Sequence, residues 1–216
     1  MSFDIGGTLV RADRGSVAAE VSALVDVPLV EVRRVLIEGG KRARTSPELL
    51  APVLARRCGT PEAMSEIRRI LDRRRAEYAV PRLYADVLPV LRSLRRRSFR
   101  ILLLSNVVGV GARDREPRFF ALADGVFLSC DTGHVKPELG AFRNAEEVVG
   151  LRPGELVHVG DSFGADVTGA WAAGWSAILL DRGGSPPPAA GEEHSGVCRL
   201  TTLEALLDLL PESCGR

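Results

Sequence analysis

The spacing of hydrophobic residues along the chain changes once, close to residue 80. Before that point apolar residues recur at intervals of three and four, which predicts amphipathic helices. After it, helical stretches alternate with short apolar runs, which predicts βα units around a parallel sheet. The pattern therefore indicates an α/β protein that carries an all-helical insert.

The first part predicts four helices, at residues 17–25, 28–38, 47–57 and 61–78. Pro28, Pro47 and Pro61 at the starts of the last three fit the first helical turn, and Ser46 and Thr60 stand where N-caps belong. The second part predicts strands at 100–104, 125–129, 156–159 and 176–180, with helices at 86–97, 117–123, 138–149, 164–173 and 203–210. We expect a doubly wound parallel sheet from residues 1–13 and 83–216, and a small all-helical domain from residues 14–82.

Composition limits the classes of function. With 45% hydrophobic and 26% charged residues, the 216-residue chain has the composition of a soluble globular protein. A net charge of +1 with interspersed signs argues against nucleic acid or an anionic membrane as partner, and no apolar run approaches the roughly 20 residues that span a bilayer. The four cysteines form no CxxC pair, which fits a reducing cytoplasm. We expect a small-molecule partner; nothing in the sequence indicates the oligomeric state.

The segment 3–9 carries the first candidate chemistry, because an apolar strand ends there in the carboxylate of Asp4. We interpret Asp4 as a nucleophile. Gly6 and Gly7 let the backbone turn sharply and approach a ligand closely, and Thr8 adds a hydroxyl and an amide at the same place.

Polar groups also follow the other predicted strands. Ser105 and Asn106 follow the second, Lys136 comes after the third, and Asp161 follows the fourth. Ligands of open parallel sheets bind beyond the carboxyl ends of the strands, so these groups should converge. Two carboxylates, a hydroxyl and an ammonium in one crevice suit a divalent cation and a phosphoryl group. Hard oxygen ligands favour Mg²⁺.

Lysine is rare in this chain, since Arg outnumbers Lys by 27 to 2. A surface cation chosen by composition alone would nearly always be Arg, so Lys136 is unlikely to be incidental. An ammonium is a compact point charge that fits a cramped phosphoryl site, whereas a guanidinium is a broad fork. The same argument draws attention to Lys41, the other lysine, in the helical insert.

Taken together, these motifs resemble those of the haloacid dehalogenase superfamily, in order and over nearly the whole chain. Asp4 resembles the nucleophile of the first motif, Ser105 the hydroxyl of the second and Lys136 the phosphate-binding lysine of the third. Residues 160–166 resemble the acidic fourth motif, in which Asp161 would hold Mg²⁺ and Asp166 would ligate it or orient the site. The insert resembles the helical C1 cap. The residues expected at the phosphoryl group are Gly7, Thr8, Ser105, Asn106 and Lys136.

The resemblance implies attack of Asp4 on phosphorus, an aspartyl phosphate and its hydrolysis. In phosphatases of this family a second Asp, two residues after the nucleophile, is the general acid and base; here that position is Gly6. Gly6 retains the main-chain carbonyl that would ligate the metal. The missing acid is typically worth ~10²–10⁴-fold, so alkyl phosphates with poor leaving groups should react slowly.

Several alternatives remain open at this stage. His134 or a group of the cap supplies the proton; or Lys41 forms a Schiff base for carbon–phosphorus cleavage, although an exposed lysine at a helix end is the simpler interpretation. A third alternative is a degenerate member that binds a phosphorylated ligand or a partner without turnover. The dehalogenase branch fits less well, because those enzymes work without Mg²⁺. His158, inside an apolar run, is expected to be a hydrogen-bonded structural residue.

Overall fold

A parallel sheet forms the centre of the molecule. The computed structural model describes residues 1–11, 15–111, 117–184 and 196–210. In these residues six strands form one sheet in the order β3-β2-β1-β4-β5-β6, with every pair parallel. The strands are β1 Ser2–Phe3, β2 Leu102–Ser105, β3 Gly125–Leu128, β4 Val157–Gly160, β5 Ser176–Leu180 and β6 Cys198–Leu200. The predicted α/β fold with a parallel sheet is confirmed.

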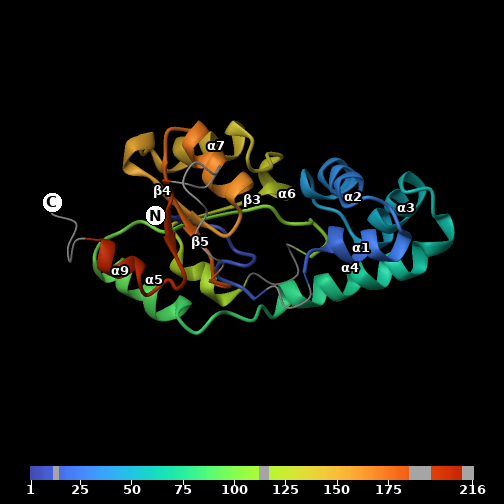
Figure 1. Ribbon diagram of the computed structural model, residues 1–216, viewed down its shortest axis with the longest axis horizontal. Coiled ribbons are helices and arrows are strands. Elements are labelled where there is room, and N and C mark those ends of the chain that lie inside the picture. The colour runs from blue at the N-terminus through green and yellow to red at the C-terminus, as the bar shows by residue number, and fades with distance from the viewer. Residues whose placement is uncertain (12–14, 112–116, 185–195, 211–216) are drawn as a thin grey trace.

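Helices cover both faces of this sheet (Figure 1). On one face lie α5 Val87–Arg96 and α9 Leu206–Leu209, and on the other α7 Leu139–Val149 and α8 Thr168–Ala172; the short α6 Ser129–Thr132 follows β3 directly. In β2, Leu103 packs into the apolar cluster under α5, whereas Leu102 and Leu104 pack into the cluster under α7. Alternate residues of a strand point to opposite faces. The continuous apolar run therefore reflects a strand buried on both sides, as a doubly wound sheet requires.

Four further helices lie beside the sheet and pack on an apolar cluster of their own (Figure 1). They are α1 Val17–Val25, α2 Leu29–Leu36, α3 Pro47–Arg57 and α4 Met64–Ala79. This helical cluster also includes Val108 and Val110, which follow β2. The domain limits expected from the sequence stay a prediction, and the limit between residues 13 and 14 lies outside the described residues.

Several short segments differ from the prediction. The helix expected at 117–123 is a 3₁₀ turn, Arg118–Leu122, in which the amides of Phe120 and Ala123 each donate three residues back. The helix expected at 164–173 begins with a π turn, Phe163–Val167, and the last helix is shorter than expected. Ser46 caps α3 as predicted, whereas the Thr60 hydroxyl makes no capping bond. The edge strand β6 was not predicted.

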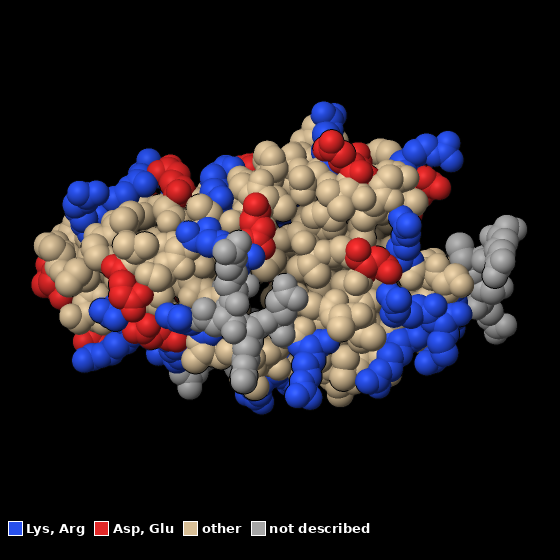
Figure 2. Space-filling view, turned by 180° about the vertical axis from the view of Figure 1, so that it is seen from behind, with Lys and Arg blue, Asp and Glu red and all other residues tan. Residues whose placement is uncertain are grey.

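The charged side chains are shown for one face of the molecule in Figure 2. Acidic and basic side chains alternate over much of this face, and basic ones gather where α5 lies, the helix that contains Arg92, Arg95 and Arg96. None of the described helices has the length and apolar content needed to cross a membrane. The cytoplasmic location and the absence of a nucleic-acid partner stay predictions.

A buried arginine connects the end of β5 to the loop that follows Asp4. The Arg182 guanidinium binds both oxygens of Asp86, at 2.9 and 3.0 Å, and donates twice to the Thr8 carbonyl, at 3.0 and 2.8 Å. It also stacks on the Tyr84 ring, 3.8 Å from the centroid. Only 13% of the Arg182 side chain and 7% of the Asp86 side chain are exposed.

Replacing Arg182 with methionine is expected to lower the free energy of unfolding by about 3 kcal/mol, because it leaves the Asp86 carboxylate buried without its cation. Urea denaturation followed by circular dichroism measures this. Arg92→Met, at an exposed position of α5, removes the same charge and should change stability by no more than about 0.5 kcal/mol. Equal stability of the two variants would contradict the assignment of Arg182 as a structural clamp.

Candidate active site

Three neighbouring strands deliver polar side chains to one edge of the sheet. Asp4 follows β1, Ser105 ends β2, and Asp161 follows β4; β1 lies between the other two. The Asp4 amide donates to the Val159 carbonyl at 2.9 Å, which continues the β1–β4 pairing up to the site. The structure thus brings together carboxylates that stand 157 positions apart in the sequence.

Lys136 lies at the centre of this group. Its ammonium donates to Asp4 Oδ1 at 2.9 Å, Asp166 Oδ1 at 2.6 Å and the Leu104 carbonyl at 2.7 Å. The residue is only 4% exposed. Burial disfavours the charged ammonium, but the Asp166 and Asp4 carboxylates outweigh burial and raise the pKa of Lys136. Lys136 is therefore a permanent cation next to the predicted nucleophile.

Asp4 itself is 7% exposed and faces the cavity with a carboxylate that is held on one side. The Ser105 hydroxyl donates to Asp4 Oδ1 at 2.9 Å, the same oxygen that Lys136 binds. Among the described residues, no hydrogen bond is made to the second oxygen, Oδ2. One oxygen is thus anchored and the other is left for a ligand.

Asp166 and His158 form a second layer behind Lys136. Asp166 Oδ2 accepts from the Ser162 amide at 2.9 Å, and Oδ1 lies 3.1 Å from His158 Nε2. Burial and the Lys136 charge lower the pKa of His158, so its ring is neutral. A carboxylate only accepts, so Nε2 carries the proton and Nδ1 accepts from the Ser2 hydroxyl at 2.9 Å. His158 is hydrogen-bonded, as expected, but its link to the site was missed from the sequence.

Three carboxylates cluster closely enough to hold a cation. Asp4, Asp161 and Asp166 each offer an oxygen, and these oxygens lie within 4.8 Å of one another. Desolvation within the cavity, together with the charges of Asp4 and Asp166, raises the pKa of Asp161 to about 7. A concentration of negative charge built from hard oxygen donors fits Mg²⁺. Gly7 is required here, because a Cβ atom at that position would overlap the Asp161 carboxylate.

Gly6 lines the cavity beside Asp4 and leaves space in it. A Cβ atom built on Gly6 would meet no heavy atom within 4 Å. Its backbone does not adopt the positive φ seen at Gly7, which is +80°. A side chain at position 6 is therefore sterically acceptable, so glycine is not required there by the fold.

The remaining residues predicted at the phosphoryl group have other contacts. The Gly7 amide donates to the Val10 carbonyl at 2.8 Å, and Thr8 is fully buried with a hydroxyl that has no hydrogen-bond partner among the described residues. Asn106 lines the cavity, but both ends of its amide are engaged by the main chain of Lys136, each at 2.8 Å. Asn106 thus fixes the position of Lys136. Direct phosphate contacts by Gly7, Thr8 and Asn106 stay predictions.

His134, the sequence candidate for a proton donor, does not line the cavity. Its side chain is exposed, its ring packs on Gly140, and its amide donates to the Thr132 hydroxyl at 3.3 Å. The geometry offers no route from this ring to a group bound at Asp4.

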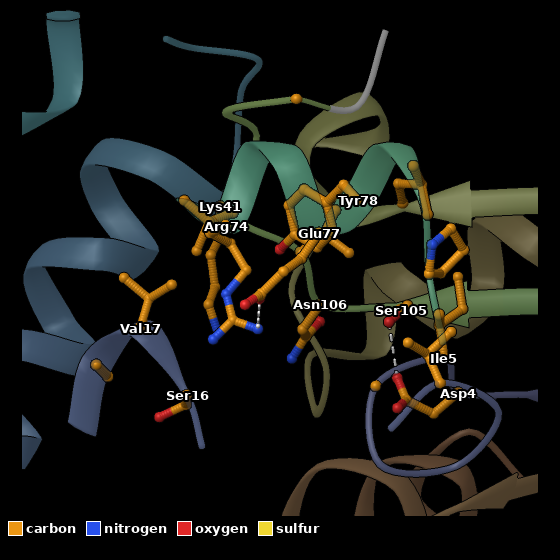
Figure 3. Close-up of a pocket in the computed structure, with 18 of the residues that line it drawn as sticks. Asp4, Ile5, Ser16, Val17, Lys41, Arg74, Glu77, Tyr78, Ser105 and Asn106 are labelled. Atoms are coloured by element: carbon orange, nitrogen blue, oxygen red, sulfur yellow. Dashed lines mark hydrogen bonds and ion pairs between the residues drawn. The ribbon is translucent and has the colours of Figure 1, made fainter. Parts of the chain in front are cut away.

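A cavity of about 1010 Å³ extends from Asp4 to the helices beside the sheet. Figure 3 shows Asp4 and Ser105 on one wall, and Lys41, Arg74, Glu77 and Tyr78 on the wall that the helices form. Arg74 is paired with Glu77 at 3.1 Å. Lys41 is only partly exposed and reaches the cavity, so the simpler interpretation of an exposed lysine at a helix end was wrong. A π turn, Ile37–Lys41, carries the chain inward at this point.

The chain is similar to several known proteins. The family model described as haloacid dehalogenase-like hydrolase matches residues 1–174. A phosphoserine phosphatase of Thermus thermophilus is 35% identical over 150 residues, which cover 65% of this chain and 57% of that protein. A glyceraldehyde 3-phosphate phosphatase of Methanopyrus kandleri is 28% identical over 196 residues, 84% of this chain and 83% of that protein. The crystal structure of a 2-haloacid dehalogenase from Pseudomonas syringae has a TM-score of 0.64 at 17% identity over 96% of both chains, which shows a common fold.

Proposed function

Because this chain belongs to the haloacid dehalogenase-like hydrolase family, we propose that it hydrolyses a small phosphate monoester in a Mg²⁺-dependent reaction. One observation carries the proposal: Asp4 faces the cavity with one oxygen anchored by Ser105 and Lys136 and the other without a hydrogen bond from the described residues. The names of the two curated relatives, both phosphatases, support the same reaction class.

In the proposed reaction, Asp4 Oδ2 attacks phosphorus, the bond from phosphorus to the leaving oxygen breaks, and an aspartyl phosphate forms. Water then attacks that phosphorus, which releases inorganic phosphate and restores the carboxylate. The Lys136 ammonium and the Ser105 hydroxyl, which donates its one proton to Asp4 Oδ1, hold Asp4 in position, and the charge of Lys136 stabilises negative charge on the phosphoryl oxygens. Both donors are already ordered before substrate binds, so little reorganisation is needed.

Asp4, Asp161, Asp166 and the Gly6 carbonyl are the groups that would hold Mg²⁺. When bound, the ion supplies positive charge to the phosphoryl oxygens. The close approach of the three carboxylates supports this assignment, because Lys136 supplies only one positive charge to a group of three acidic side chains. We further propose that residues 14–82 are a cap that selects the substrate.

Gly6 determines which substrates react well. Without a carboxylic acid at that position, the leaving oxygen departs without a proton from the usual donor. Esters whose leaving group is a weak base, such as aryl and acyl phosphates, lose little by this, whereas alkyl phosphates lose most. The proposal therefore includes a preference for good leaving groups.

Removal of metal tests the proposal. Treatment with EDTA is expected to lower phosphate release from p-nitrophenyl phosphate by roughly 100-fold or more, because charge stabilisation by a metal is worth several kcal/mol. Added MgCl₂ should restore the rate, and NaCl of equal ionic strength is the control. A rate that persists in EDTA would remove the metal from the mechanism.

Carbon–phosphorus cleavage is a second candidate, favoured by the position of Lys41 in the cavity. Burial and the Arg33 charge lower the pKa of Lys41, while Asp4 opposes this effect. A neutral amine is what Schiff-base formation requires. Phosphonoacetaldehyde with sodium borohydride should then label Lys41 covalently, and an unlabelled Lys41 by peptide mass spectrometry would eliminate this candidate. A protein that only binds a phosphorylated ligand would release no phosphate from any ester.

A further inference from the structure

Three of the cations that line the cavity are paired with acidic side chains of the protein. Arg73 and Arg74 both bind Glu20, and Arg74 also binds Glu77. Lys136 is paired with Asp4 and Asp166. Lys41 differs, because its ammonium forms no ion pair or hydrogen bond with any described residue. Arg33 also lines the cavity and forms no ion pair with any described residue, but it is exposed, whereas Lys41 is partly buried. The helical wall of the cavity therefore presents an uncompensated positive charge.

Backbone contacts fix where Lys41 stands. The Gly109 amide donates to the Gly40 carbonyl at 2.7 Å, and the Thr45 amide donates to the Gly109 carbonyl at 3.1 Å. These bonds join both sides of the turn that carries Lys41 to the segment that follows Ser105. Gly40 is also packed against Leu50 so closely that a Cβ atom would displace it. The backbone at Lys41 is thus held at a set place relative to the segment that follows Ser105.

We propose that Lys41 binds a carboxylate of the substrate, so that the natural substrate is a phosphate monoester that also bears a carboxylate. This inference rests on the proposed function for the position of the phosphoryl group. That group is expected at Asp4, Ser105 and Lys136, and Lys41 lies across the cavity from Asp4 and Ser105, on the wall that the helices form (Figure 3). Attack by Asp4 in line with the leaving oxygen directs the leaving group away from Asp4, toward that wall. One ammonium matches the single charge of a carboxylate. A partly buried cation without a counter-ion is costly, and a substrate carboxylate supplies that counter-ion.

Binding measurements with a matched pair of probes test this. D-3-Phosphoglycerate carries a carboxylate where sn-glycerol 1-phosphate, which has the same arrangement at C2, carries a hydroxymethyl group. Calorimetry uses the Asp4→Asn protein with Mg²⁺, so that neither probe is consumed. The phosphoglycerate is expected to bind roughly 10- to 100-fold more tightly, the range of a charge-assisted hydrogen bond. Equal affinity for the two probes would overturn the proposal.

Variants at position 41 test whether Lys41 causes the tighter binding of the probe that carries a carboxylate. In the same background Lys41→Met should bring the two affinities close together, whereas Lys41→Arg, which keeps the charge, should retain most of the difference. Arg34→Met, at an exposed position of α2 that does not line the cavity, removes the same charge and should leave the preference intact. A preference that survives Lys41→Met would overturn the proposal, and the melting temperature of each variant verifies folding.

Phosphate release by the unsubstituted protein separates this inference from the proposed function. Tighter binding of D-3-phosphoglycerate without phosphate release from any ester supports the role of Lys41 and contradicts hydrolysis. Release of phosphate from aryl phosphate, together with equal binding of the two probes, supports hydrolysis and contradicts the role of Lys41.

Discussion

Asp4→Asn is expected to lower Mg²⁺-dependent phosphate release by roughly 10⁴-fold or more, the scale on which removal of a catalytic nucleophile acts. An amide oxygen is a much weaker nucleophile than a carboxylate oxygen. The change also removes one negative charge from the three-carboxylate cluster, which weakens the proposed metal site. The measurement is the steady-state rate with an aryl phosphate, compared with the unsubstituted protein under the same conditions.

The control for this variant is Asp208→Asn, which makes the same chemical change at an exposed position of α9. It should retain the full rate. Rapid acid quench with radiolabelled acyl phosphate should trap label on the unsubstituted protein and none on Asp4→Asn. If Asp4→Asn still released phosphate at a comparable rate, the nucleophile would have to be a different group.

Gly6→Asp is expected to raise the turnover of alkyl phosphates, by up to the ~10²–10⁴-fold that general acid–base catalysis typically contributes. The structure accommodates the change, since a Cβ atom at position 6 has no heavy atom within 4 Å and the position faces the cavity beside Asp4. Aryl phosphates should gain far less, because their leaving groups need no proton. The ratio of kcat/KM for an alkyl and an aryl ester is the quantity to measure.

Gly6→Asn is the matched control, with nearly the same size and no proton to transfer. It should leave the alkyl-to-aryl ratio of the unsubstituted protein unchanged. Rapid hydrolysis of alkyl phosphates by the unsubstituted protein, with no gain from Gly6→Asp, would show that another group donates the proton. Glu77, which lines the cavity from α4, would then be the first residue to substitute.

The fold could be predicted well from the sequence because the two hydrophobic periods are distinct. Four of the strands are continuous apolar runs, and burial on both faces of a parallel sheet produces that pattern. The edge strand β6 was not predicted, because Cys198–Leu200 is only partly buried and, at three residues, is too short to show a hydrophobic period. The 3₁₀ turn at Arg118–Leu122 was predicted as a helix, because the hydrophobic pattern of five residues is the same for a 3₁₀ turn and an α-helix.

For the site, the sequence indicated residue types but not their partners. Asp4, Ser105, Lys136 and Asp161 could be grouped because each follows a predicted strand, and parallel strands end at the same edge. The contacts of Asn106 with Lys136 depend on the approach of segments 30 residues apart, which no local pattern encodes. His158 gave one indication, a polar side chain in a run that was otherwise buried. For Lys41 the only indication was the rarity of lysine.

The four helices α1 to α4 cannot be exchanged on their own, because their apolar cluster includes residues from the segment after β2. Val108 and Val110 come from the segment after β2, yet they are buried in the helical cluster. A chimera that exchanged only these helices would pack the two valines against side chains of another protein. It would also disturb the backbone hydrogen bonds that Gly109 makes with Gly40 and Thr45. A transplant that preserves packing therefore has to include residues 107–110 together with the insert. The packing of the helical cluster and the placement of Ser105 are then inherited as one unit.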